Sequence, residues 1–276
     1  MASFPWNLVF GIYCHQSGVL VKITFLGTGT STGVPAIGCA CAVCRSNDPR
    51  NKRRRTSLYV QAAGQHIIID TPPDFRDQVL TFGVRRVDAV LITHAHADHV
   101  FGFDDIRRFN DVQDAVIPVY GSPDTIAAMN RFFPYVHKVA QPGLSYPRVD
   151  FQAVTAPFVF GPVRIEPLRV EHAGIETYGY RLEADGRTLG YVPDCHRLSE
   201  AVAQRLRGLD CLILDGLRRK HHPTHFALDQ SVAELQRLGA RRSFITHMTH
   251  DLDHETTAQT LPPGIEIPYD GLVVEA

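Results

Sequence analysis

The chain has 276 residues, 44% of them hydrophobic, which is enough for a buried core and fits one large domain or two small ones. Its formal net charge is -1, so no overall field attracts it to nucleic acid or to an anionic membrane. The longest apolar runs are only as long as strands, and we expect no transmembrane helix.

The N-terminal residues lack the basic start and the small-residue cleavage site of a secretory signal. We interpret residues 1–20 as a loosely packed N-terminal extension ahead of the first strand. Residues 21–276 contain no linker, low-complexity segment or legible repeat, which predicts a single domain. The six cysteines are unevenly spaced, unlike a disulfide framework, and favour a reducing, cytoplasmic location.

Residues 21–93 predict several strands. "VKITFLG" indicates a buried strand that opens into a Gly-, Thr- and Ser-rich loop. A cysteine-rich segment follows and ends in "RNKRRR", which we interpret as a solvated basic turn. "SLYVQAAGQHIIID" predicts a hairpin that turns at Ala63-Gly64, and residues 74–83 have helical character. "VDAVLIT" is almost wholly apolar, which is typical of a strand buried on both faces.

Strands and helices continue to the end of the chain. A helix begins within "VFGFDDIRRFN", "AVIPVYG" predicts a strand, and "PDTIAAMNRFF" predicts a helix with proline in its first turn. Residues 143–192 are rich in strands and contain a second hairpin at Asp185-Gly186. The strands "CLILD", "SFITH" and "GLVVEA" then alternate with helices over 199–207, 227–238 and 254–260. This order predicts an α+β fold in which two sheets lie between helical layers.

The segment "THAHADHV" concentrates potential metal ligands directly after a buried strand. It places four of them on an expected tight loop, namely His94, His96, Asp98 and His99. His94 and His96, at alternate positions, can converge on one ion, while the other two turn towards a second. Imidazole together with carboxylate suits zinc, manganese or iron better than calcium. The cluster therefore predicts a two-metal hydrolytic centre.

This cluster resembles that of the metallo-β-lactamase superfamily, whose members fold as an αββα four-layer sandwich with a dinuclear site between the sheets. The resemblance implies three further ligands at later strand ends, and the chain offers His172, Asp194 and His247. It implies that one metal is bound by His94, His96 and His172. It implies that the other is bound by Asp98, His99 and His247, with Asp194 bridging the two ions.

A second candidate site is the cysteine clip in "GCACAVC", which consists of Cys39, Cys41 and Cys44. Three closely spaced thiols in a cytoplasmic protein favour three corners of a tetrahedral zinc site, and packing of small buried residues is the alternative. A fourth ligand is required, and His250 lies three residues after His247.

The stretch "FLGTGTSTGVPAIGCACAVC", with "DPRNKRRRTS" after it, is similar to the branch that contains the phosphonate-pathway cyclic-phosphate phosphodiesterases. The resemblance extends from about Lys22 to the C-terminus and implies a structural zinc, held by three cysteines and one histidine, beside the catalytic metals. Pyrroloquinoline-quinone biosynthesis protein B is similar in its Gly-rich start and cysteine loop, so this loop alone does not decide the function.

Two metals a few ångströms apart can hold a bridging hydroxide as the nucleophile, but the leaving oxygen also needs a proton donor outside the metal ligands. "GLRRKHHPTHF" resembles the histidine loop of superfamily phosphodiesterases, which makes His225 our first candidate and His222 the second. A solvated approach to a helix is the alternative for this segment. We count Asp98 among the catalytic residues as well as among the ligands, and Asp70 is a candidate to orient a ligand imidazole.

We therefore predict a metal-dependent phosphodiesterase for a small cyclic or diester phosphate, of the phosphoribosyl cyclic phosphate type, with two catalytic divalent ions (zinc or manganese) and one structural zinc. The alternatives are a tRNA 3′-end processing endonuclease, a protein like pyrroloquinoline-quinone biosynthesis protein B, and a non-catalytic zinc-binding module. The absence of net positive charge and of a long Gly- and Pro-rich arm argues against tRNA. The expected partner is a small phosphate ester, without nucleic acid or membrane, and a homodimer is compatible with the sequence.

Overall fold

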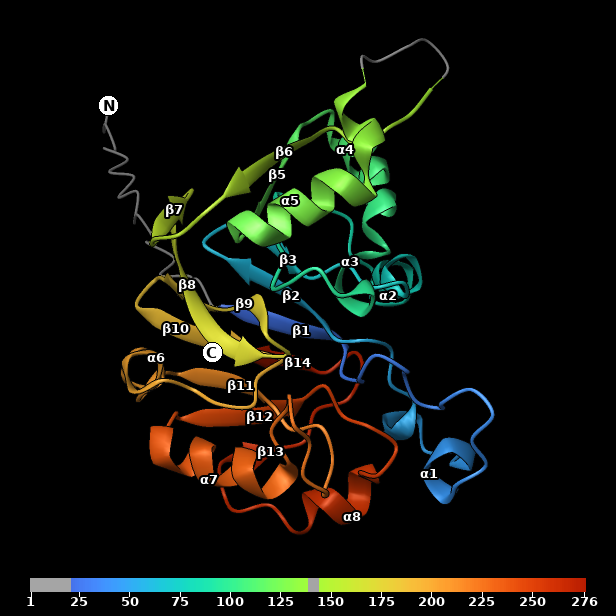
Figure 1. The fold of residues 1–276 in the computed structure, drawn as a ribbon, viewed down its shortest axis with the longest axis vertical. Coiled ribbons are helices and arrows are strands. Elements are labelled where there is room, and N and C mark those ends of the chain that lie inside the picture. The colour runs from blue at the N-terminus through green and yellow to red at the C-terminus, as the bar shows by residue number, and fades with distance from the viewer. Residues whose placement is uncertain (1–20, 139–143) are drawn as a thin grey trace, which may run out of the picture.

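Two seven-stranded sheets lie face to face in the computed structural model, which describes residues 21–138 and 144–276 (Figure 1). The first sheet contains, in order across it, β14 (Val273–Glu275), β1 (Lys22–Gly27), β2 (Ser57–Ala62), β3 (Gln65–Ile69), β4 (Ala89–Leu91), β5 (Ile117–Gly121) and β6 (Val149–Ala153). The second contains β13 (Ile265–Glu266), β12 (Arg242–Thr246), β11 (Cys211–Asp215), β10 (Arg187–Val192), β9 (Ile175–Ala184), β8 (Val163–His172) and β7 (Phe158–Phe160). Parallel pairing joins β3, β4 and β5 in one sheet and β10, β11 and β12 in the other, so their carboxyl ends lie at a common edge of each sheet.

Eight α-helices flank the two sheets within the described residues. They are α1 (Ala42–Arg45), α2 (Phe75–Thr81), α3 (Ala97–Val100), α4 (Ile106–Gln113), α5 (Pro123–Phe132), α6 (Glu200–Leu206), α7 (Leu228–Leu238) and α8 (His254–Ala258). Side chains of α2, α4 and α5 pack on the outer face of the first sheet, and those of α6 and α7 pack on the outer face of the second. A third apolar cluster fills the space between the sheets. The predicted αββα sandwich is confirmed.

Strand β3 shows how the sequence produces these layers. Successive side chains of a strand point to opposite faces of the sheet. Ile67 and Ile69 accordingly pack between the sheets, whereas Ile68 packs against the helices, and all three are fully buried. A strand that is buried on both faces needs an unbroken apolar run, which explains why this strand and β4 lack polar alternation.

Most predicted elements are confirmed to within a few residues. The sequence missed two short ones, α1 and β13, and the histidine cluster forms the helical turn α3 where a tight loop was expected. That turn closes because the amide of Phe101 donates to the carbonyl of Ala97. The extension predicted for residues 1–20 lies outside the described residues. None of the described helices has the length and apolar character needed to span a bilayer.

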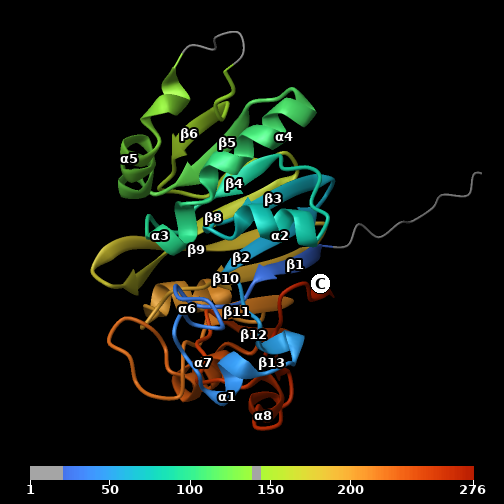
Figure 2. The same cartoon turned by 90° about the vertical axis from the view of Figure 1, so that its right-hand side faces the viewer.

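The basic run at residues 50–55 is not the solvated turn that the sequence predicted. Arg53 is only 2% exposed, and its guanidinium donates to the carbonyl of Thr249 at 2.9 Å and to that of Leu252 at 2.6 Å. The next two arginines form ion pairs with aspartates at the start of α2. These contacts tie the loop after β1 to the segment after β12, and α1 lies beside α8 although the two are far apart in sequence (Figure 2).

Replacing Arg53 by methionine should therefore lower the free energy of unfolding by about 3 kcal/mol, because two buried carbonyl groups would lose their charged donor. Urea denaturation measures the effect. Arg50→Met is the matched control, because Arg50 lies in the same run but forms its ion pairs at the surface, where they contribute little. Equal denaturation midpoints for Arg53→Met and the parent would contradict the structural role of this arginine.

Candidate metal centres

The carboxyl ends of strands from both sheets bring seven candidate ligands together. Four of them follow β4, within or just before α3, while the last residue of β8 and the segments after β10 and β12 supply the others. All seven are buried or partly buried, and they are His94, His96, Asp98, His99, His172, Asp194 and His247. The strand topology therefore brings together side chains that are up to 153 positions apart in the sequence.

The first group consists of His94, His96 and His172, whose ligand nitrogens all lie within 4.8 Å of one another. Nε2 of His94 lies 2.9 Å from Nδ1 of His96. Oδ2 of Asp194 faces this group, at 3.8 Å from Nε2 of His94 and 3.6 Å from Nε2 of His172. Ligands about 2.0–2.1 Å from a tetrahedral zinc are separated from one another by about 3.3 Å, so the spacing suits one ion.

The second group consists of Asp98, His99 and His247. Oδ2 of Asp98 lies 3.4 Å from Nε2 of His99 and 3.5 Å from Nε2 of His247. The other carboxylate oxygen of Asp194, Oδ1, lies 3.3 Å from Nε2 of His99. Asp194 thus faces both groups, which is the arrangement expected of a bridging ligand.

The donor atoms have the chemistry that divalent cations require. Nε2 of His99, His172 and His247 and Oδ1 of Asp194 are buried and have no hydrogen-bond partner within residues 21–138 and 144–276. Leaving such an atom unpaired costs about 1–3 kcal/mol. Burial lowers the pKa of His172 to about 4, so this imidazole is neutral at pH 7, as a metal ligand must be.

Buried negative charge adds to this fit. Burial disfavours the charged form of His99, but the carboxylates of Asp194, Asp98 and Asp70 outweigh burial and raise its pKa. Buried carboxylates without compensating positive charge are strongly unfavourable. The residues therefore fit a pair of divalent ions, and mixed imidazole and carboxylate donors are typical of zinc or manganese.

Contacts behind the ligands hold two of the imidazoles in place. Oδ2 of Asp70 accepts a hydrogen bond from Nδ1 of His99 at 2.8 Å, which is the role that the sequence predicted for this carboxylate. The backbone N–H of Thr93 donates to the other oxygen of Asp70 at 2.8 Å. Nδ1 of His172 donates to the carbonyl of Thr224 at 2.9 Å. The contacts made by Nδ1 of His99 and Nδ1 of His172 each fix the tautomer that leaves Nε2 free to bind an ion.

His225 lies against the candidate ligands, with its ring centroid 4.6 Å from that of His172. Its Nδ1 lies 2.7 Å from Oδ2 of Asp215, a contact that was not predicted from the sequence although "CLILD" ends in an aspartate just as "IIID" does. Burial lowers the pKa of His225, and the carboxylate of Asp194 opposes that shift. His222, the second candidate, is partly exposed, and its Nδ1 contacts Thr224 instead.

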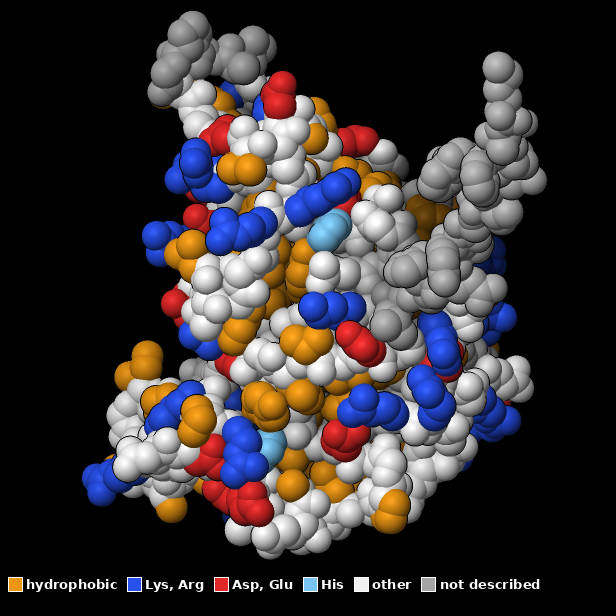
Figure 3. All heavy atoms as spheres, turned by 180° about the vertical axis from the view of Figure 1, so that it is seen from behind, with side chains coloured by type: hydrophobic (Ala, Val, Ile, Leu, Met, Phe, Trp, Pro, Cys, Tyr) orange, Lys and Arg blue, Asp and Glu red, His pale blue; other side chains and the backbone are white. Residues whose placement is uncertain are grey.

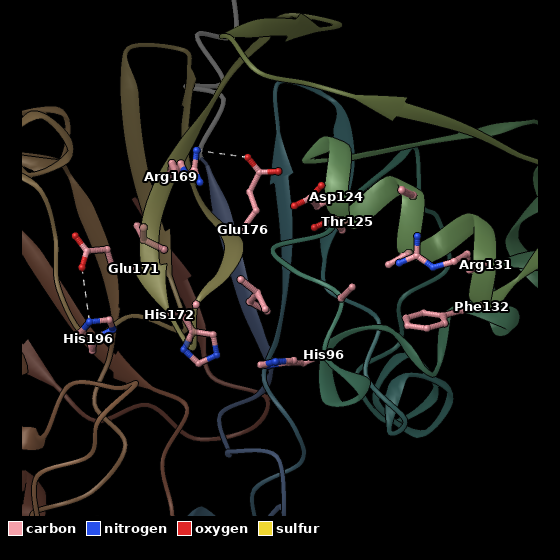
Figure 4. A pocket seen from close by; sticks show the side chains of 16 residues that line it. His96, Asp124, Thr125, Arg131, Phe132, Arg169, Glu171, His172, Glu176 and His196 are labelled. Carbon is pink, nitrogen blue, oxygen red and sulfur yellow. Dashed lines mark ion pairs between the residues drawn. The ribbon is translucent and has the colours of Figure 1, made fainter.

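A cavity of about 750 Å³ opens beside the first ligand group. His96 and His172 line one end of it, α5 supplies one wall, and the β8–β9 hairpin supplies the other (Figure 4). The ligands are therefore accessible to a small molecule from this side.

The structure brings the three cysteines of the clip close to His250. Nδ1 of His250 lies 3.1 Å from Sγ of Cys39, 3.5 Å from Sγ of Cys41 and 3.4 Å from Sγ of Cys44. The backbone N–H of Cys44, one turn along α1, donates to the Cys41 sulfur and lowers the pKa of Cys41 to about 6. Thiolates at this spacing, with one imidazole, match a closed tetrahedral zinc site.

Comparisons with known proteins agree with this geometry. A family model described as "Beta-lactamase superfamily domain" matches residues 65–248. The chain is 40% identical to a solved diphosphatase from the PhnP family, with a TM-score of 0.85, and the match covers 93% of this chain and 97% of that one. A zinc-bound PqqB from Methylobacterium extorquens shares the fold at 20% identity and a TM-score of 0.77, over 92% of this chain and 100% of that one.

A third relative differs in length. The chain is 35% identical to an octanoyltransferase of Porphyromonas gingivalis, and the match covers 91% of this chain but 51% of that protein. The chain thus spans about half the length of this relative.

The cysteine clip generates a prediction about metal content. Cys41→Ser should lose one zinc per chain and lower the melting temperature, because a closed four-ligand site contributes directly to folding. The content of catalytic metal should fall less. Elemental analysis and thermal denaturation measure both effects.

Ala42→Ser, an exposed position in the same turn, is the control and should keep about two catalytic ions and one structural zinc. If Cys41→Ser retains every zinc and its melting temperature, the thiols are packing residues. At most one metal ion in parent protein never exposed to a chelator would contradict the two-metal centre.

Proposed function

We propose that this chain, which belongs to the β-lactamase superfamily and within it to the PhnP-like branch, is a metal-dependent phosphodiesterase for a small cyclic or diester phosphate. The observation that carries the proposal is the His225–Asp215 pair: His225 belongs to neither of the two ligand groups assigned above, although one of its ring nitrogens lies within 4.8 Å of the ligand atoms of His172 and Asp194. Hydrolysis of an unactivated diester requires a proton donor in this position, because an alkoxide is a poor leaving group. A substrate of the phosphoribosyl cyclic phosphate type meets this requirement.

The residues divide the work of the reaction. When bound, the two divalent ions supply Lewis acidity towards the phosphoryl oxygens and a hydroxide nucleophile at neutral pH. One P–O bond forms to the oxygen of water, and the P–O bond to the alcohol breaks. His225 donates the proton on Nε2 to the departing oxygen, while Asp215 stabilises the positive charge of the ring and fixes its orientation.

The alternatives have less support. The chain is 32% identical to the coenzyme PQQ synthesis protein B of Methylobacterium nodulans over 71% of its length, but its similarity to the PhnP-family diphosphatase is higher, at 40% identity, and covers 93% of the chain. On the face seen in Figure 3, basic and acidic side chains lie side by side over the described part, so this face offers no continuous basic area for tRNA. A small phosphate ester therefore remains the proposed substrate.

His225→Ala separates chemistry from metal binding. The variant should keep all its metal, because no ligand is removed, but should hydrolyse a diester with an alkoxide leaving group on the order of a hundred- to ten-thousand-fold more slowly. The loss should be much smaller for bis-p-nitrophenyl phosphate, since nitrophenolate leaves without a proton. Steady-state kinetics on both esters, with elemental analysis, measures the difference.

His222→Ala is the matched control from the same loop and should behave like the parent on both esters. Equal losses on the two esters in His225→Ala would show that this residue positions the phosphate. Full activity of His225→Ala on the alkoxide ester would show that it has no part in the reaction.

A further inference from the structure

The cavity between α5 and the β8–β9 hairpin is larger than a phosphoryl group requires. Its volume, about 750 Å³, is within the range of sites that enclose whole small molecules. It is continuous with the first ligand group, because His96 and His172 line it (Figure 4). Any part of the substrate that extends from the phosphoryl group on this side therefore contacts the two walls.

The α5 wall is small and apolar at its centre. Ala127 and Ala128 line it there, and Phe132 lies at the last turn of the helix. Phe132 is 41% exposed, and Phe101 and Phe133 pack edge-on against its ring, with centroids 5.4 Å and 6.4 Å away. These two contacts hold the ring in place at the wall of the cavity.

Ile175 supplies the apolar part of the opposite wall. It pairs directly with His172 across the β8–β9 hairpin, and residues opposite each other in an antiparallel pair project from the same face. Ile175 therefore projects on the side where His172 offers its imidazole, and it is 39% exposed. The turn at Ala173 and Gly174, with φ of 48° and 71°, fixes the tip of this hairpin.

Two of the acidic side chains of the walls are paired within the protein, whereas Asp124 and Arg131 form no ion pair with the described residues. On the hairpin, Glu171 and Glu176 form ion pairs with arginines. On α5, Asp124 lies in the first turn and Arg131 in the last, where the helix dipole favours each charge. Phe132 and Ile175, by contrast, expose apolar surface to water, and exposed apolar groups gathered at a cavity mark a binding surface.

We infer that Phe132 and Ile175 form an apolar clamp that binds a ring, or another apolar group, on one ester arm of the substrate. The inference rests on the proposed phosphodiesterase function and specifies a substrate class within it, namely diesters with an apolar or aromatic group on one ester arm in place of the phosphoribosyl cyclic phosphate type. The clamp holds this arm while the phosphoryl group lies at the ligands beyond His96 and His172. No bond forms or breaks at the clamp.

Phenylphosphonate and methylphosphonate test the clamp by titration calorimetry on the metal-loaded protein. They offer the same anion and differ only in the apolar arm. The parent should bind phenylphosphonate on the order of ten-fold more tightly, because the clamp removes the ring from water. Phe132→Ala and Ile175→Ser should each bring the ratio of the two Kd values close to one. Leu80→Ala, at an exposed apolar position of α2 outside the cavity, should leave the ratio unchanged.

A ratio close to one in the parent, or an unchanged ratio in both clamp variants, would overturn the inference. Elemental analysis of each variant establishes that the ions are in place, so a lost preference reports the clamp. Turnover of diesters tests the proposed function separately. A preference for phenylphosphonate without turnover of any diester would support the clamp and contradict the phosphodiesterase function. Turnover of diesters with equal affinities for the two phosphonates would support the function and contradict the clamp.

Discussion

The rest of the site depends on burying carboxylates at the carboxyl ends of the strands. Asp70, Asp194 and Asp215 are each at most 2% exposed, and each contacts at least one imidazole. Burying a carboxylate is unfavourable unless opposite charge and hydrogen bonds compensate for it. Histidines, backbone N–H groups and, in our proposal, two divalent ions provide this compensation. The two sheets bring these groups together, because the strands that carry them end at the same edge.

The sequence predicted the parts of this arrangement that depend on local pattern. Apolar runs located the buried strands, and ligand-type residues directly after them located the candidate site. The pairing of Asp215 with His225 was missed, because it depends on where the loop after β11 returns. The sequence also did not predict the left-handed backbone conformation of Asp70 and His247, which have φ of 66° and 61°. Residues other than glycine adopt this conformation only where surrounding contacts enforce it, at a cost of about 1–3 kcal/mol.

Arg53 shows how such contacts arise and why composition gave a wrong prediction for the basic run. Its guanidinium binds carbonyl groups on both sides of His250, so hydrogen bonds from this buried side chain fix the segment that carries His247 and His250. Gly29 pairs with Met248, between these two histidines, and gives the segment a second attachment. One short stretch thus supplies a ligand to each candidate metal centre. A charge run is usually solvated, but here its middle arginine replaces water as the donor to buried carbonyl groups.

Two kinds of residue line the cavity: candidate metal ligands and apolar wall residues. His96 and His172 belong to the candidate ligand set at the strand ends. Phe132 and Ile175 belong to the walls, and neither contributes a ligand atom. A fold that serves a diphosphatase and PqqB cannot by itself select a substrate. Selection of the substrate therefore has to come from the walls of the cavity. The direct pairing of Ile175 with His172 across the β8–β9 hairpin fixes the position of this wall residue relative to the candidate metal ligands.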